Sequence, residues 1–242
     1  MAIKIGHASI SEKGTITGNA GDQTGKEVCV RTWYSKPWGF VLRCKDALKA
    51  EKMANACEAG CSNNNIGYDQ NQRNTAHTKA KAVGYDLSKI KEPCETDCSA
   101  FMTLCAIAAG VSELEYTGNA PTTSTMQKVF KATGQFDVLT DSKYLTSDKY
   151  LIRGDILVRA GSHTVMALEN GSEAVKETVQ YYPRYTGTST SIVVALQAVK
   201  VDSNFNYRKK IAAVNNITGY TGTASQNTQM LNLLKQGKLK KA

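Results

Sequence analysis

The sequence has little that would mark a membrane protein, an exported protein or a disordered chain. No apolar run reaches the roughly 18 residues that a membrane-spanning helix needs, and the N-terminal residues lack the apolar core of a secretory signal. Of the 242 residues, 41% are hydrophobic and 21% are charged, which is ordinary for a folded globular protein. We therefore expect a chain made in the cytoplasm without a signal peptide, forming one large domain or a medium domain with a small module.

Cysteine is absent from the second half of the chain, since none of the seven cysteines follows Cys105. Their odd number and the lack of a signal argue against a full disulfide framework. Cys57 and Cys61 are four residues apart, as are Cys94 and Cys98, and this spacing also occurs in zinc sites. However, Cys57 falls in a helical apolar pattern, where a small buried side chain is the simpler interpretation. We expect no metal and no other cofactor.

Acidic residues are almost absent from the last quarter of the chain. Residues 182–242 contain nine Lys and Arg but only one acid, Asp202, which gives a net charge of +8, whereas residues 1–181 carry +1. Such an asymmetry indicates two regions with different partners. A basic region attracts polyanions such as nucleic acid, anionic lipid or an anionic cell-wall polymer. A solvated, solubilising surface is the alternative interpretation.

The hydrophobic pattern predicts a mixture of strands and helices. Apolar alternation between turn residues predicts strands at 3–10, 14–18, 26–34, 38–44, 155–159, 163–168 and 174–179. Helical spacing predicts helices at 46–58, 75–83 and 123–131, and a further helix that begins at Thr96 or Asp97 and ends at Gly110. Gly60 is expected to stop the first helix, and Asn170-Gly171 to form a hairpin turn. The basic region reads as a module of two or three helices.

Cys98 is the first candidate for chemistry, because it is predicted at the start of a helix, directly after Asp97. The helix dipole and the free backbone N–H groups at that position favour a thiolate and lower the thiol pKa. The thiolate is the nucleophilic form of cysteine. A purely structural cysteine is the alternative, and Cys105 on the same helix is expected to be one.

His163 is the second candidate among only three histidines. It opens an apolar strand after a Gly-Ser turn, where its side chain can face a cleft. A cysteine nucleophile needs a base, and imidazole titrates in the useful range. A surface histidine is the alternative interpretation. His7, in a strand-like segment, and His77, in a polar helix, are weaker candidates.

Two motifs together resemble a known family. The sequence DCSAFMTLC, followed later by GDILVRAGSHTVMALENG, resembles the NlpC-type cysteine peptidases of bacterial cell-wall turnover, which are relatives of the CHAP amidases. By this resemblance Cys98 is the nucleophile and His163 is the base, while Tyr68, Asp97 and Ser99 would line the substrate site. The whole layout is also similar to phage and prophage endolysins of Gram-positive bacteria.

The resemblance implies an α+β fold, with a papain-like domain over 1–180 and a small helical wall-binding module over 181–242. It implies an endolysin that hydrolyses an amide bond in peptidoglycan by a Cys-His thiolate mechanism. The expected partners are peptidoglycan and anionic wall polymers, with no nucleic acid and no membrane insertion. The protein would be made in the host cytoplasm and act at the cell wall. A papain-like acyltransferase or transamidase and a non-enzymatic basic wall-binding protein remain as alternatives.

The family usually has a third polar residue that orients the histidine, on the strand after it, and here that position is Val175. Glu169 and Asn170 would lie about 20 Å from His163 along an extended strand. A three-residue hairpin loop would instead bring Glu177 opposite His163. Glu177 is therefore the candidate for the third residue, with a backbone carbonyl or a plain Cys-His dyad as alternatives.

Overall fold

The computed structural model describes residues 2–9, 27–174 and 181–242. The chain divides into two compact units, Met1–Ala174 and Val175–Ala242. The first unit combines an antiparallel sheet with helices, so the predicted α+β class is confirmed. In the part that is described, no helix is both long and apolar enough to cross a bilayer.

The first unit is organised around a six-stranded sheet whose neighbouring strands all run antiparallel. In spatial order the strands are β2 (Val28–Thr32), β1 (Lys4–Ala8), β8 (His163–Ala167), β7 (Ile156–Arg159), β3 (Phe40–Cys44) and β6 (Phe136–Leu139). A separate parallel pair consists of β4 (Ile66–Tyr68) and β5 (Cys94–Thr96). The strands from both ends of this unit therefore meet in the middle of one sheet, where β1 lies beside β8.

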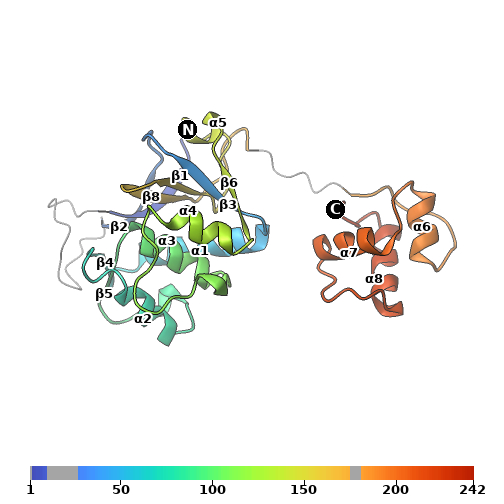
Figure 1. The fold of residues 1–242 in the computed structure, drawn as a ribbon, viewed down its shortest axis with the longest axis horizontal. Helices are drawn as coiled ribbons and strands as arrows, with labels where there is room; N and C mark the ends of the chain where they lie inside the picture. The colour runs from blue at the N-terminus through green and yellow to red at the C-terminus, as the bar shows by residue number, and fades with distance from the viewer. Residues whose placement is uncertain (1, 10–26, 175–180) are drawn as a thin grey trace. The chain divides into compact units, whose positions relative to one another are not determined.

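The longer helices lie on one side of this sheet, whereas the short helix Ser142–Leu145 lies on the other (Figure 1). The α-helices of the unit are α1 (Ala47–Ser62), α2 (Thr75–Ala82), α3 (Cys98–Ala108), α4 (Met126–Ala132) and α5 (Ser142–Leu145). Short 3₁₀ turns, η1 (Leu87–Lys89) and η2 (Ser112–Leu114), follow α2 and α3. α1 and α3 pack against each other and against the strands β1 and β8.

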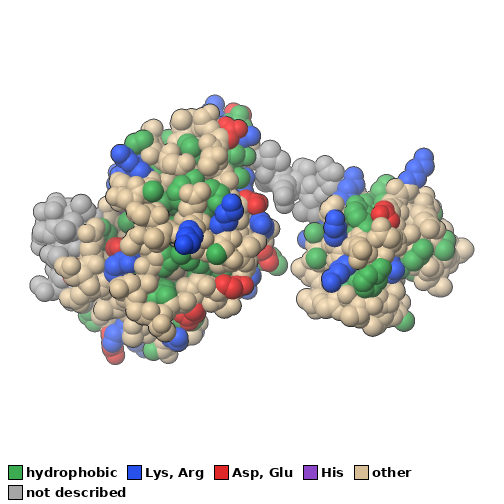
Figure 2. All heavy atoms as spheres, viewed as in Figure 1, with side chains coloured by type: hydrophobic (Ala, Val, Ile, Leu, Met, Phe, Trp, Pro, Cys, Tyr) green, Lys and Arg blue, Asp and Glu red, His purple; other side chains and the backbone are tan. Residues whose placement is uncertain are grey.

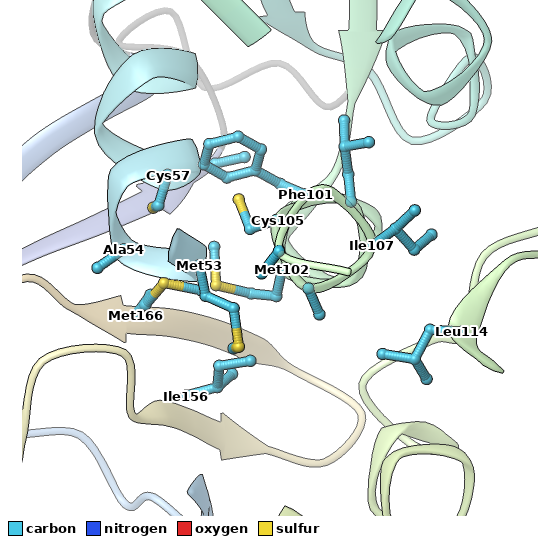
Figure 3. Packing of buried hydrophobic residues seen from close by; sticks show 14 of the residues in the cluster. Met53, Ala54, Cys57, Phe101, Met102, Cys105, Ile107, Leu114, Ile156 and Met166 are labelled. Atoms are coloured by element: carbon cyan, nitrogen blue, oxygen red, sulfur yellow. The ribbon is translucent and has the colours of Figure 1, made fainter. Parts of the chain in front are cut away.

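The expected helix stop at Gly60 is wrong, because α1 continues to Ser62. A Cβ atom at Gly60 would lie only 2.5 Å from Cε2 of Phe101 on α3. The glycine therefore serves close packing of the two helices rather than helix termination. In Figure 3 the α3 side chains Phe101, Met102 and Cys105 lie among Met53 and Cys57 of α1 and Met166 of β8. Cys105 is fully buried, which confirms its expected place in the core.

The predicted hairpin at Asn170-Gly171 is also wrong. The two neighbours of β8 are β7 and β1, so a strand that followed residue 170 would find both sides of β8 occupied. Gly171 instead approaches the loop before β7, where a Cβ atom would lie 2.1 Å from the carbonyl oxygen of Asp148. Glu177, Val175 and most of the two remaining predicted strands lie outside the described residues.

The second unit is a small helical bundle with its own apolar core. Its helices are α6 (Ile192–Ala198), α7 (Phe205–Val214) and α8 (Ala224–Lys235). Tyr182, Tyr185 and Tyr220 are buried in this core together with aliphatic residues from all three helices. The backbone N–H of Tyr182 donates to the carbonyl of Leu239 at 2.8 Å, so the beginning and the end of the unit lie side by side.

Candidate active site

Cys98 is the first residue of α3, as the sequence predicts. Asp97 caps the helix, and its Oδ1 accepts a hydrogen bond of 2.7 Å from the backbone N–H of Ala100. β5 runs directly into this cap, so the nucleophile candidate lies at a strand-to-helix junction. The Cys98 side chain is nevertheless buried, and the residue is only 7% exposed.

The expected lowering of the Cys98 pKa is wrong. Burial, followed by the charge of Asp97, raises the pKa of the Cys98 thiol to about 12. The backbone groups of Thr164 and Ser99 and the cation of Arg73 act in the opposite direction but do not outweigh burial. Cys98 is therefore a neutral thiol at pH 7 in this structure, and it needs a base that removes its proton during attack.

A buried polar network fixes the start of α3. Arg73 donates to Asp97 through Nε at 2.5 Å, and Ser99 Oγ donates to Asp97 Oδ1 at 3.0 Å. The same guanidinium reaches the carbonyl oxygens of Ala120 and Pro121 at 2.8 and 2.9 Å. The polar atoms of Asp97 and Ser99, which the resemblance assigns to the substrate site, are thus engaged inside the protein. Their arrangement holds the Cys98 backbone rigidly in place.

His163 is the first residue of β8 and is also 7% exposed. The next residue, Thr164, interacts through its backbone with the Cys98 sulfur. α3 and β8 pack against each other, so the two predicted residues lie at the same end of paired elements. Asp155, from the Gly-Asp motif before β7, is fully buried and binds Arg43 with Nη2 to Oδ2 at 2.6 Å. This ion pair connects the start of β7 to β3.

His7, a weaker candidate from the sequence, lies directly beside His163. Its Nδ1 lies 3.4 Å from Nε2 of His163, and its Nε2 lies 3.5 Å from Sγ of Cys29. Cys29 is the direct partner of His7 in the pairing of β1 with β2. His7 is only 2% exposed. The sequence does indicate that His7 faces the same side of a strand as Ile3 and Ile5. It does not indicate that His7 lies beside His163, because the two residues are 156 positions apart in the sequence.

Both histidines are neutral at pH 7. Burial is the main cause that lowers the pKa of His163 to about 4, and Lys36 and Arg31 add to it. Burial, the charge of His163 and Arg31 lower the pKa of His7 to about 3. A neutral imidazole has one nitrogen that can accept a proton, which is what a general base requires. Across the described ranges, no three His, Cys, Asp or Glu side chains gather as metal ligands.

Tyr68, the last residue of β4, is buried close to Cys98. Burial raises the pKa of Tyr68 to about 12, and the charges of Cys98 and Asp97 contribute to this shift. Gln70 Nε2 donates to the Tyr68 hydroxyl oxygen at 3.0 Å, so the hydroxyl hydrogen can be donated elsewhere. Tyr68 is therefore a protonated donor beside the thiol.

A comparison with known proteins assigns the chain to a family. No curated protein and no solved structure matches the chain. A family model of an endolysin-like domain matches residues 5–174, a segment that includes His7, Cys98 and His163. This family indicates a hydrolase that lyses the bacterial cell wall. Because the match covers most of the chain, the protein belongs to the endolysin-like domain family.

Proposed function

We propose that the protein hydrolyses an amide bond in peptidoglycan, with Cys98 as nucleophile, His163 as general base and His7 as the residue that orients His163. The observation that carries this proposal is the contact of the Cys98 sulfur with the backbone of Thr164, next to His163. The His163 side chain in turn contacts His7, and His7 contacts Cys29. A helix-start cysteine packed on an antiparallel sheet that carries the histidine also supports the NlpC-type, papain-like assignment.

The proposed mechanism requires one tautomer of each ring. Nε2 of His163 faces His7, so in this mechanism Nδ1 of His163 is the nitrogen that takes the proton of the thiol. To accept a proton on Nδ1, His163 must carry its hydrogen on Nε2 and donate it to Nδ1 of His7. His7 then carries its hydrogen on Nε2 and donates it to Sγ of Cys29, at 3.5 Å. The sulfur of Cys29 can accept this hydrogen, so the contact is compatible with the tautomer in which His163 is a base.

The reaction follows from this arrangement. Nδ1 of His163 takes the thiol proton while the Cys98 sulfur forms a bond to the carbonyl carbon, which leaves an oxyanion. The backbone N–H at the start of α3 and the Tyr68 hydroxyl are the donors available to that oxyanion. The amine then leaves with the proton from His163, giving an acyl-enzyme. A water molecule, deprotonated by His163, attacks the thioester, releases a carboxylic acid and restores the thiol.

Product analysis tests this function and its alternative. Purified peptidoglycan is incubated with the wild-type protein or with Cys98→Ala, and the soluble products are identified by mass spectrometry. Hydrolysis generates one new amine and one new carboxylate for each bond cut. New peptide cross-links would instead indicate transamidation, and no change with the folded wild-type protein would contradict both enzymatic functions.

We also propose that the second unit binds anionic polymers of the cell wall. Support comes from its net charge of +8 and from the excess of Lys and Arg on the face seen in Figure 2. Tyr182 and Tyr185 are buried in its core, which leaves little of their rings to stack on sugars. A pocket of about 560 Å³, lined by Lys209, Ala213 and residues 216–221, is a shaped surface of this unit.

A salt series separates charge from shape in this binding. Full-length Cys98→Ala and residues 175–242 alone are pelleted with purified walls. Screening shortens the Debye length from about 10 Å at 0.1 M to about 3 Å at 1 M, so purely electrostatic binding should be lost. Binding that persists would favour the pocket, and Lys209→Gln should then weaken it. An isolated, folded unit that never pellets with walls would contradict the proposal.

A further inference from the structure

A row of rings leads from His163 to an exposed cation. The His163 ring stacks on Trp38, with centroids 6.4 Å apart and an interplanar angle of 29°. Trp38 in turn contacts Tyr34 at 5.9 Å, and the guanidinium of Arg31 lies over the Tyr34 ring at 4.8 Å. Arg31 belongs to β2, whereas the two aromatic residues belong to the segment that precedes β3. These side chains form one continuous wall beside the base.

The wall contains a buried hydrogen-bond donor, the indole N–H of Trp38. Trp38 is 5% exposed, and its indole N–H has no hydrogen-bond partner among the described residues. The neighbouring Trp33 has the same property. A buried donor that is left unpaired costs about 1–3 kcal/mol, so its presence calls for an explanation such as a functional role.

The same wall carries positive charge that the described acids do not neutralise. Arg31 is exposed and Lys36 is half-buried, and neither has an ion-pair partner within the described parts of the chain. Both cations act on the base, because each lowers the pKa of His163. The charges of Arg31 and Lys36 and the indole N–H of Trp38 are groups that attract an anion. An anion bound there would also restore proton affinity to His163.

We propose that the wall formed by Arg31, Tyr34, Lys36 and Trp38 binds a free carboxylate of the peptide part of peptidoglycan, next to the amide that is cut. The inference rests on the proposed hydrolysis and adds a substrate requirement to it. Peptidoglycan peptides carry several carboxylates, and an amide at the same position is nearly isosteric but uncharged. A guanidinium binds a carboxylate in a planar, two-point geometry, which gives both affinity and orientation.

Matched substrates test the subsite. Pairs of peptidoglycan fragments are compared, and the two members of each pair differ only in one carboxylate near the scissile bond, which is free in one and amidated in the other. The position of this carboxylate relative to the scissile bond differs from pair to pair. We expect the wild-type protein to prefer the free carboxylate at one position by at least 10-fold in kcat/KM. Arg31→Gln and Lys36→Gln should each reduce this preference, and Trp38→Phe should reduce it less. Lys128→Gln, which removes an exposed cation from α4, is the matched control.

The pH dependence gives a second readout. A bound carboxylate that offsets the two cations should raise the pKa of His163 in the substrate complex. The acidic limb of kcat, which reports the complex, should then lie at higher pH than that of kcat/KM, which reports the free enzyme. This difference should vanish with the amidated substrate. Equal hydrolysis of every matched pair would overturn the subsite but leave the proposed hydrolysis intact. A folded wild-type protein that hydrolyses none of the fragments and no intact peptidoglycan would overturn both.

Discussion

Two histidine sites in the first unit are equally buried but differ in their partners. His77, on α2, lies 2.7 Å from a carboxylate oxygen of Glu115 and stacks on Tyr116 with ring centroids 4.2 Å apart. His163 contacts a second histidine and Trp38, and cations lie nearby. The contact with Glu115 anchors His77 to the fold, whereas burial keeps His163 neutral. Equal burial therefore does not make the two rings equivalent, because their charged neighbours differ.

The largest effect should come from removing the base or the nucleophile. His163→Ala and Cys98→Ala should each lower wall lysis by at least about 10³-fold, because the two residues act as one unit. His77→Gln and Cys105→Ala are the matched controls and should retain most activity. Turbidity loss of purified walls measures the rate, and thermal unfolding checks folding. Near-normal lysis by Cys98→Ala would refute the mechanism.

A smaller effect is expected at His7, because it acts through His163. His7→Phe should lower kcat by about 10²-fold, while His7→Gln, which can still accept from Nε2 of His163, should lower it by about 10-fold. KM should change little in either variant. Cys29→Ser should be milder still, since a hydroxyl can replace the sulfur as acceptor. A loss in KM alone, or equal loss in both His7 variants, would point to a structural role.

The pH profile should sharpen the same contrast. Because the pKa of His163 is lowered to about 4, its imidazole stays neutral and basic above about pH 5. The acidic limb of kcat/KM on amidated fragments should therefore lie near pH 4 instead of near 6.5, the ordinary value for histidine. Stability has the same sign: the unfolded state binds protons first, so the free energy of unfolding should fall as the pH drops below about 6.5. An acidic limb near 6.5 would contradict this environment.

The smallest effect is expected at the anchored histidine. Glu115→Gln removes the charge that faces His77, and Lys81 also lies 3.4 Å from this carboxylate. The free energy of unfolding should fall by about 1 kcal/mol, measured by urea denaturation, with no change in the lysis rate. A large loss of activity in this variant would mean that the His77 site takes part in the function.

The sequence predicts those features whose causes are local. Asp97 caps a helix within three residues, and the apolar spacing places Cys105 in the core, so α3 and the position of Cys98 at its start can be located from the sequence. Gly60 has a partner, Phe101, far along the chain, and its role depends on how two helices pack. The same limitation applies to the thiol pKa. Helix-start position favours a thiolate, but the surrounding protein buries Cys98, and this larger effect is not visible in the sequence.

The residue that we propose to orient His163 shows the limit most clearly. The family resemblance places such a residue on the strand after His163, which led to Glu177; Glu177 lies outside the described residues and stays a prediction. In the structure β1 pairs with β8, so the ring beside His163 comes from the seventh residue of the chain. Sequence order and spatial order differ here because antiparallel pairing can join any two strands of suitable length.

The closure of the second unit on itself has a practical consequence. Its first residues pair with its last, through the hydrogen bond from Tyr182 to Leu239 and the bridge between Tyr181 and Lys240. A unit whose entry and exit points are adjacent can be inserted, exchanged or repeated with short joins that leave its interior undisturbed. Tandem copies would then raise avidity for a repetitive polymer by increasing the effective concentration of the second copy once the first is bound. If the second unit binds the cell wall as proposed, its adjacent ends make it suitable for transfer into engineered lysins.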